Sequence, residues 1–158
     1  MIMPIRTSLK IVTSCIVLLV TSLQACADSP PEIAETKVIV ESDLQHHRWL
    51  LDSINGEALP QDHAEDKIPE LDFGEQMHVS GSTGCNRYNG KAVLRDGYFQ
   101  IESMASTRRM CAPPANELER LFITMLGQDS RISIDGDRNL ILESGKTVLI
   151  FRLRDWVR

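Results

Sequence analysis

Apolar and polar positions alternate with a period of two along most of the chain after Arg48, the pattern of strands that bury one face. Clusters of turn residues interrupt this alternation at short intervals. The pattern predicts about eight strands, at Trp49–Ile54, Glu70–Phe73, Met77–Val79, Ala92–Arg95, Tyr98–Ile101, Arg131–Ile134, Leu140–Leu142 and Val148–Leu153. The expected fold is therefore mainly β (α+β), a small antiparallel barrel-like sheet.

Short turn signals separate the predicted strands. Asp96-Gly97 is the strongest hairpin signal, because both residues tolerate positive φ. Asn55-Gly56 is expected to end the first strand, and the polar stretch Glu57–Pro69 to form a loop. Gly81–Gly90 holds three glycines and two asparagines, which predicts an irregular loop rather than a strand.

One segment has helical instead of strand periodicity. Asn116–Leu126 is expected to be an amphipathic helix with one apolar stripe, made of Leu118, Leu121, Phe122, Met125 and Leu126. Pro113-Pro114 precede it, Glu117 and Glu119 fall in its expected first turn, and Gly127 is expected to end it. We expect the stripe to pack against the sheet and to close a barrel that is otherwise open at one edge.

The N-terminal residues have the composition of an export signal. Residues 1–25 place Arg6 and Lys10 before a short apolar stretch, too short to span a bilayer. Leu23-Gln24-Ala25-Cys26 is similar to a bacterial lipobox, which predicts lipidation of Cys26 and an outer-membrane lipoprotein facing the periplasm. The alternative is a plain secretory signal cleaved nearby.

Residues 26–43 are expected to be a flexible tether, with a short edge strand at Val38–Val40 as the alternative, and residues 44–158 to be the folded domain. Without the first 25 residues the chain has 15 basic and 22 acidic residues, since Arg6 and Lys10 are the only charges removed. This balance argues against a nucleic-acid partner, which requires a positive face. The membrane, an envelope protein or a lipid is the expected partner, and the chain is expected to be a monomer.

Cys85 and Cys111 are the only cysteines within the predicted domain. An exported protein is exposed to oxidising conditions, so the default expectation is a disulfide between them. A pair of buried thiols is the alternative. No CxxC motif is present, so the pair is expected to have a structural role.

No other pattern of residues predicts chemistry. His46 and His47 are adjacent, which on a strand points them to opposite faces, and His63 lies in an acidic loop. Neither has the spacing of a known metal site, so no metal and no cofactor are expected. No nucleophile elbow or phosphate-binding glycine loop is found, so no enzymatic activity is expected.

Two polar segments remain as candidate binding loops. They contribute Asn86, Arg87 and Tyr88 from the glycine-rich segment, and Arg108 and Arg109 from the segment before Cys111. Asn86 suits hydrogen bonding to loop backbone, which favours a structural role over contact with a ligand.

These segments carry a resemblance to a known family. The motifs are Leu44–Trp49 with Leu51–Gly56, Pro69–Glu75, Ser80–Ser82 with Cys85–Arg87, and Met104–Cys111 followed by Asn116–Leu118. Together they resemble the META-domain family, and within it the HslJ-type heat-shock lipoproteins. The resemblance implies a small β-rich barrel with a packed helix, a shape similar to lipid-binding pilotins, and a link to envelope stress and drug tolerance. It implies no catalytic residues.

Three functions follow from the sequence as hypotheses. The first is a non-enzymatic stress-response lipoprotein that binds an apolar ligand or an envelope protein and supports envelope integrity or drug tolerance. The second is an inhibitor of a periplasmic hydrolase such as a lysozyme, acting through the loop at Gly81–Asn89 or at Thr107–Met110. The third, an enzyme, has no motif to support it.

Overall fold

The computed structural model describes residues 37–59 and 67–154, all within the compact unit Glu35–Arg158. The expected signal at 1–25, the lipidation site Cys26, the first part of the tether and His63 lie outside the described residues. No helix in the described ranges is both long and apolar enough to cross a membrane.

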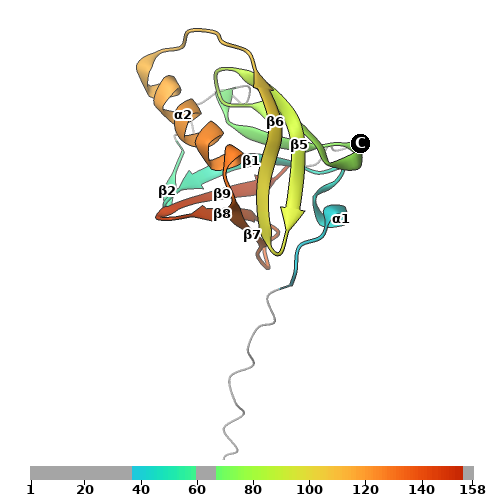
Figure 1. The fold of residues 1–158 in the computed structure, drawn as a ribbon. Helices are drawn as coiled ribbons and strands as arrows, with labels where there is room; N and C mark the ends of the chain where they lie inside the picture. Colours follow the sequence, from blue (N-terminus) through green and yellow to red (C-terminus); the bar gives the residue numbers. More distant parts are fainter. Residues whose placement is uncertain (1–36, 60–66, 155–158) are drawn as a thin grey trace, which may run out of the picture. The chain divides into compact units, whose positions relative to one another are not determined.

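The described residues form nine antiparallel strands of one sheet (Figure 1). The strands are β1 (Arg48–Ile54), β2 (Glu57–Ala58), β3 (Glu70–Phe73), β4 (His78–Ser82), β5 (Arg87–Arg95), β6 (Tyr98–Ser106), β7 (Ser130–Ile134), β8 (Leu140–Ser144) and β9 (Thr147–Leu153). Their order is β2-β1-β3-β4-β5-β6-β7-β8-β9, and β1 also pairs with β9. The predicted mainly β, barrel-like fold is confirmed.

The ring is closed by strands and not by the helix, so the sequence-based expectation on this point was wrong. β1 and β9 pair from Trp49↔Leu153 to Ile54↔Leu149, with one register shift. Pairing is sparser elsewhere in the ring, because β6 and β7 pair only at Tyr98↔Arg131 and Phe99↔Ser130, and β3 and β4 also share two residue pairs. The alternation of side chains does not reveal which two strands close the ring, since that depends on the curvature of the whole sheet.

The helix α2 (Pro113–Gly127) connects β6 to β7 and packs against β6. Phe122 is fully buried, and its ring lies near those of Tyr88 on β5 and Phe151 on β9, at 5.9 and 6.1 Å between centroids. The helix therefore fills the space where β6 and β7 separate. The predicted apolar stripe is confirmed as part of the core.

The predicted start of this helix was wrong, whereas its predicted end at Gly127 is confirmed. It begins at Pro113 and not at Asn116, because proline fits the first turn, where no intrahelical N–H bond is needed. Its first turn consequently holds no acidic residue, and Glu117 and Glu119 lie further in. Gly127 is its last residue, followed by Gln128 in extended conformation.

The segment Gly81–Gly90, expected to be an irregular loop, is mostly strand. β4 includes Gly81 and Ser82, β5 starts at Arg87, and a four-residue turn joins them. At Gly81 a Cβ atom would overlap the carbonyl oxygen of Glu70 on β3. The glycine therefore serves a close approach of two strands, which sequence alone does not distinguish from a flexible turn.

Several strand bounds also differ from the expected ones. β6 continues to Ser106, five residues past the predicted end at Ile101, through polar positions that hide the alternation. The third strand begins at His78, since Met77 belongs to the short 3-10 helix η2 (Glu75–Met77). Residues Glu57–Ala58, expected as loop, form β2. The hairpin at Asp96-Gly97 is confirmed, with Arg95 paired to Tyr98.

Packing extends upstream of Leu44, where the domain was expected to start. Ile39 is only 6% exposed, and it joins the core together with Leu44 from the short helix α1 (Glu41–Leu44). Lys37 pairs with Asp43 at 2.6 Å, and this bond lowers the pKa of the Asp43 carboxyl. The part of the expected tether that the structure describes, residues 37–43, thus lies against the domain, with no strand at Val38–Val40.

Candidate functional site

The turn between β4 and β5 is built by reciprocal hydrogen bonds of Thr83 and Asn86. The Thr83 N–H donates to the Asn86 carbonyl at 2.8 Å, and the Asn86 N–H donates to Thr83 Oγ1 at 2.8 Å. Gly84 sits in this turn at φ +86°, and a Cβ there would lie 2.7 Å from the Lys67 carbonyl oxygen. The turn is thus pressed against the segment that leads into β3.

The side chain of Asn86 connects this turn to the loop before α2 and to α2 itself. Its Oδ1 accepts bonds from the Arg109 N–H at 2.7 Å and from Thr107 Oγ1 at 2.8 Å. Its Nδ2 donates to the Arg109 carbonyl at 3.1 Å and to Glu119 Oε2 at 3.0 Å. Asn86 is 4% exposed and its amide is fully bonded. Its geometry supports the structural role that the sequence favoured.

Residues 107–112 are also attached to the β4–β5 turn by contacts other than those of the Asn86 amide. The structure joins Cys85 to Cys111 by a disulfide, with their Cα atoms 6.3 Å apart. The Arg109 guanidinium also donates to the Cys85 carbonyl. Figure 1 shows this segment passing from the end of β6 to the start of α2. A loop with so many anchors loses little further conformational entropy when it binds a partner.

The five residues of the candidate binding loops do not share one exposed surface. Asn86 and Tyr88 are buried, whereas Arg87, Arg108 and Arg109 are exposed. Of the five, the structure brings Asn86 and Arg109 into direct contact. The most exposed apolar side chain beside them is Met110, at 95%, at the end of the segment Thr107–Met110 that the sequence offered as an inhibitory loop.

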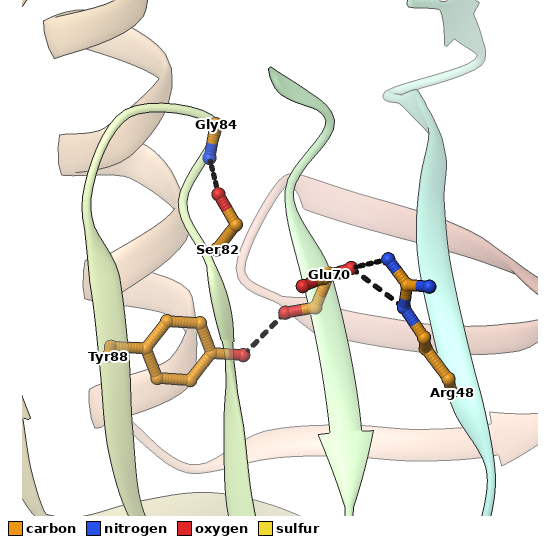
Figure 2. Close-up of polar contacts among 5 residues, drawn as sticks. All are labelled: Arg48, Glu70, Ser82, Gly84 and Tyr88. Atoms are coloured by element: carbon orange, nitrogen blue, oxygen red, sulfur yellow. Dashed lines mark hydrogen bonds and ion pairs between the residues drawn. The ribbon is translucent and has the colours of Figure 1, made fainter. Parts of the chain in front are cut away.

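Tyr88 belongs to the interior of the sheet (Figure 2). Its hydroxyl crosses β4 over Gly81 and donates to the Glu70 carbonyl on β3 at 2.7 Å. The Glu70 carboxylate pairs with Arg48 on β1, where Nε donates at 2.8 Å. Burial raises the pKa of Tyr88 well above its usual value, and the nearby carboxylates of Glu70 and Asp72 add to this effect. Tyr88 is therefore a neutral structural donor and not a ligand contact.

An apolar groove lies beside the same turn. It has a volume of about 420 Å³ and an almost wholly apolar lining, consisting of Leu59, Lys67, Ile68, Pro69, Gly84, Ala112, Pro114, Ala115 and Leu118. These residues come from the segment before β3, from the β4–β5 turn and from the first turns of α2. The volume is within the range of small-molecule sites.

Lys67 is the only charged residue in this lining, and its side chain makes no ion pair with any residue that the structure describes. The groove was not predicted from the sequence, because four of its nine lining residues lie in the polar segment Glu57–Pro69. The signal that could have indicated it is the pair of aliphatic residues Leu59 and Ile68 within that segment.

The fold and the turn that carries Cys85-Asn86-Arg87 place the chain in a known class. The META domain family matches residues 42–156. The chain belongs to the META-domain family.

A curated relative and two solved structures are similar to this chain. Heat shock protein HslJ of Escherichia coli (strain K12) is 36% identical over 125 residues, which cover 78% of this chain and 86% of HslJ. A protein solved by NMR, also 36% identical, superimposes with a TM-score of 0.61 over 72% of this chain and 94% of its own. A Burkholderia xenovorans protein solved by NMR, 21% identical, shows the same fold with a TM-score of 0.58, over 79% and 99% of the two chains.

These similarities support a stress-related META-domain protein. Neither the family name nor the name of the relative is that of an enzyme.

Proposed function

We propose that this protein is a non-enzymatic envelope lipoprotein of the stress response that binds an anionic amphiphile, an acyl chain with a carboxylate or phosphate head, in the apolar groove. The groove carries the proposal, because its lining is apolar apart from Lys67. Acyl carbons replace water along Ile68, Ala115 and Leu118. The ammonium of Lys67 at the rim attracts the anionic head.

The groove is tested by filling it. Ala115→Trp places an indole in the groove, and we expect the affinity for a fluorescent fatty acid to fall by roughly tenfold or more, since the apolar contact area is lost. Thr124→Trp, at an exposed position of the same helix, is the matched control and retains wild-type affinity. Saturable binding that Ala115→Trp leaves unchanged, or no saturable binding at all, overturns the proposal.

The role of Lys67 is tested by a pair of ligands with the same chain length. Lys67→Glu weakens binding of a fatty carboxylate and leaves binding of the matching fatty alcohol unchanged, because only the former carries a charge. Isothermal calorimetry on wild type and variant measures both affinities. An equal loss for both ligands contradicts the assignment of the head group to Lys67.

Anchoring at the membrane rests on the lipobox-like ending at Cys26. Mass spectrometry of the chain extracted from bacterial envelopes is expected to give an N-terminus at Cys26 that carries acyl groups. Cys26→Ser removes the acyl groups and releases the protein from the outer-membrane fraction, since stable anchoring requires more than one acyl group. An unmodified N-terminus near residue 26 indicates a plain secretory signal instead.

A second candidate function, inhibition of a periplasmic hydrolase, is favoured by the anchored loop that exposes Met110. Pre-organised loops of this kind suit insertion into an active site. A turbidity assay with cell walls and lysozyme tests it, with Met110→Ala as the variant. Protection that is lost in the variant supports the inhibitor, and no protection at excess protein removes it for lysozymes.

A further inference from the structure

The side chains of Cys85, Cys111 and Glu119 meet at one point, although no sequence spacing groups them. The two sulfurs and one carboxylate oxygen all lie within 4.8 Å of one another. Cys85 belongs to the turn between β4 and β5, Cys111 to the loop before α2, and Glu119 to the second turn of α2. Two sulfur ligands and one carboxylate are a donor set that zinc uses in proteins.

The charge of Glu119 is not balanced by a cationic side chain among the residues that the structure describes. Its carboxylate is half-buried, and among the described residues no Lys, Arg or His forms an ion pair with it. It accepts hydrogen bonds from neutral donors, Asn86 Nδ2 at 3.0 Å and Thr83 Oγ1 at 3.2 Å. A half-buried carboxylate without a cation beside two sulfurs is a feature that a bound cation explains.

We propose that the protein binds one Zn²⁺ ion through Cys85, Cys111 and Glu119 when the disulfide is reduced. A dithiol reductant transfers two electrons and two protons to the disulfide, which gives two thiols and leaves the reductant as its own disulfide. Zn²⁺ then displaces the two thiol protons and binds both thiolates. The metal takes the place of the covalent bond between the turn and the loop.

The surroundings hold the carboxylate in a fixed orientation. Asn86 is itself fixed by Thr107 and Arg109, so its Nδ2 holds Glu119 Oε2 and leaves Oε1 toward Thr83. Hydrogen bonds of this kind orient metal-binding side chains. Cys111 and Glu119 are only half-buried, which leaves room for a water as the fourth ligand of a tetrahedral ion. The site shares none of its three residues with the lining of the groove, and it does not rest on the ligand proposed there.

The test uses the full chain in detergent with Cys15→Ser and Cys26→Ser, which leaves Cys85 and Cys111 as its only cysteines. The protein is reduced with a phosphine and titrated with Zn²⁺ against a chromophoric chelator, and Cd²⁺ is used to observe thiolate-to-metal charge transfer. The expected result is one ion per reduced chain, a charge-transfer band with Cd²⁺, and no binding to the oxidised chain.

Two variants distinguish the site from non-specific binding by thiols. Glu119→Gln keeps the side-chain shape and is expected to lower the Zn²⁺ affinity by roughly tenfold or more, whereas Glu117→Gln, on the exposed side of the same helix, leaves it unchanged. Far-UV circular dichroism confirms that each variant is folded. A reduced chain that takes up no zinc, or binding that Glu119→Gln does not weaken, overturns the proposal.

Discussion

Asn86 has all four hydrogen-bonding positions of its amide occupied, two at Oδ1 and two at Nδ2. One end of the amide accepts and the other donates. Oδ1 accepts from Thr107 and Arg109, and Nδ2 donates to acceptors that include the Glu119 carboxylate. A residue that is both donor and acceptor is therefore required here, and at neutral pH the asparagine amide supplies both.

Asn86→Asp tests this requirement. The new carboxylate faces that of Glu119, so we expect a loss of roughly 2–4 kcal/mol in the free energy of unfolding at neutral pH. The repulsion raises the pKa of one of the two carboxyl groups in the folded state. The loss is therefore smaller under acidic conditions, where that group is protonated.

Denaturant unfolding at neutral and acidic pH measures the effect. Asn89→Asp, at an exposed position of β5, introduces the same charge away from Glu119 and is expected to change stability little. Equal effects of both variants contradict the assigned role of Asn86.

Tyr88 is expected to make the free energy of unfolding fall at alkaline pH. Its pKa is raised in the folded state by burial and by Glu70 and Asp72, so its contribution is complete below its unfolded pKa of about 10 and is lost as pH rises above that value. We expect the free energy of unfolding to fall between about pH 8 and about pH 11. Tyr88→Phe costs about 1 kcal/mol at neutral pH through the lost bond to Glu70 and removes this part of the alkaline fall.

Tyr98 provides the control, since it is the other tyrosine of the chain and is 42% exposed. Tyr98→Phe is expected to retain the alkaline fall. Urea unfolding at both pH values distinguishes the variants, and an alkaline fall of wild-type size in Tyr88→Phe contradicts the prediction.

At the scale of the elements, strand β4 lies unusually close to β3 at one point. Gly81 on β4 leaves room both for the Glu70 carbonyl and for the Tyr88 hydroxyl that bonds to it (Figure 2). Three neighbouring strands, β3, β4 and β5, are thus linked by one side-chain hydrogen bond in addition to their backbone ladders. This bond exists because β4 has no side chain in between.

Gly81→Ala is expected to destabilise the protein by roughly 2 kcal/mol or more, because its methyl group overlaps the Glu70 carbonyl and forces the strands apart. Gly136→Ala is the matched control, since a Cβ at that position has no atom within 4 Å and the φ of Gly136 is not in the left-handed region. Thermal and denaturant unfolding compare the two. A Gly81→Ala protein as stable as wild type refutes the close approach.

At the scale of the whole molecule, the ring of strands is continuous but uneven. β1 and β9 pair along most of their length, whereas β3 with β4 and β6 with β7 share two residue pairs each, and β6 and β7 are joined by α2. α2 covers the short β6–β7 pairing through Phe122, Met125 and Leu126, and the disulfide fixes the start of the helix to the β4–β5 turn. The turn, the loop before α2 and the helix therefore form one connected support.

Removal of the disulfide is expected to cost about 3 kcal/mol, by the entropy of closing a loop with a sequence separation of 26 residues. The double variant Cys85→Ser/Cys111→Ser and the reduced wild type, both in the presence of a metal chelator, are expected to unfold at the same denaturant concentration. If the oxidised and reduced wild-type proteins have the same midpoint of denaturant unfolding, the disulfide does not stabilise the fold.

The sequence determined the local elements. Alternation placed most strands within one or two residues, Asp96-Gly97 specified its hairpin, and the apolar stripe identified the helix. These features depend on neighbours along the chain, so periodicity and turn chemistry are sufficient to predict them. The motifs around Cys85 and Cys111 also indicated the family correctly.

Only the tertiary structure decided which distant residues meet. The pairing of β1 with β9, the passage of Tyr88 over Gly81, the groove between Ile68 and Leu118, and the contact of Asn86 with Glu119 all join separate segments. Such contacts depend on how the sheet curves and where the helix packs, which no local pattern encodes. For the same reason the sequence left Tyr88 among the candidates for binding, whereas burial makes it part of the framework together with Asn86, for which the sequence had already favoured a structural role.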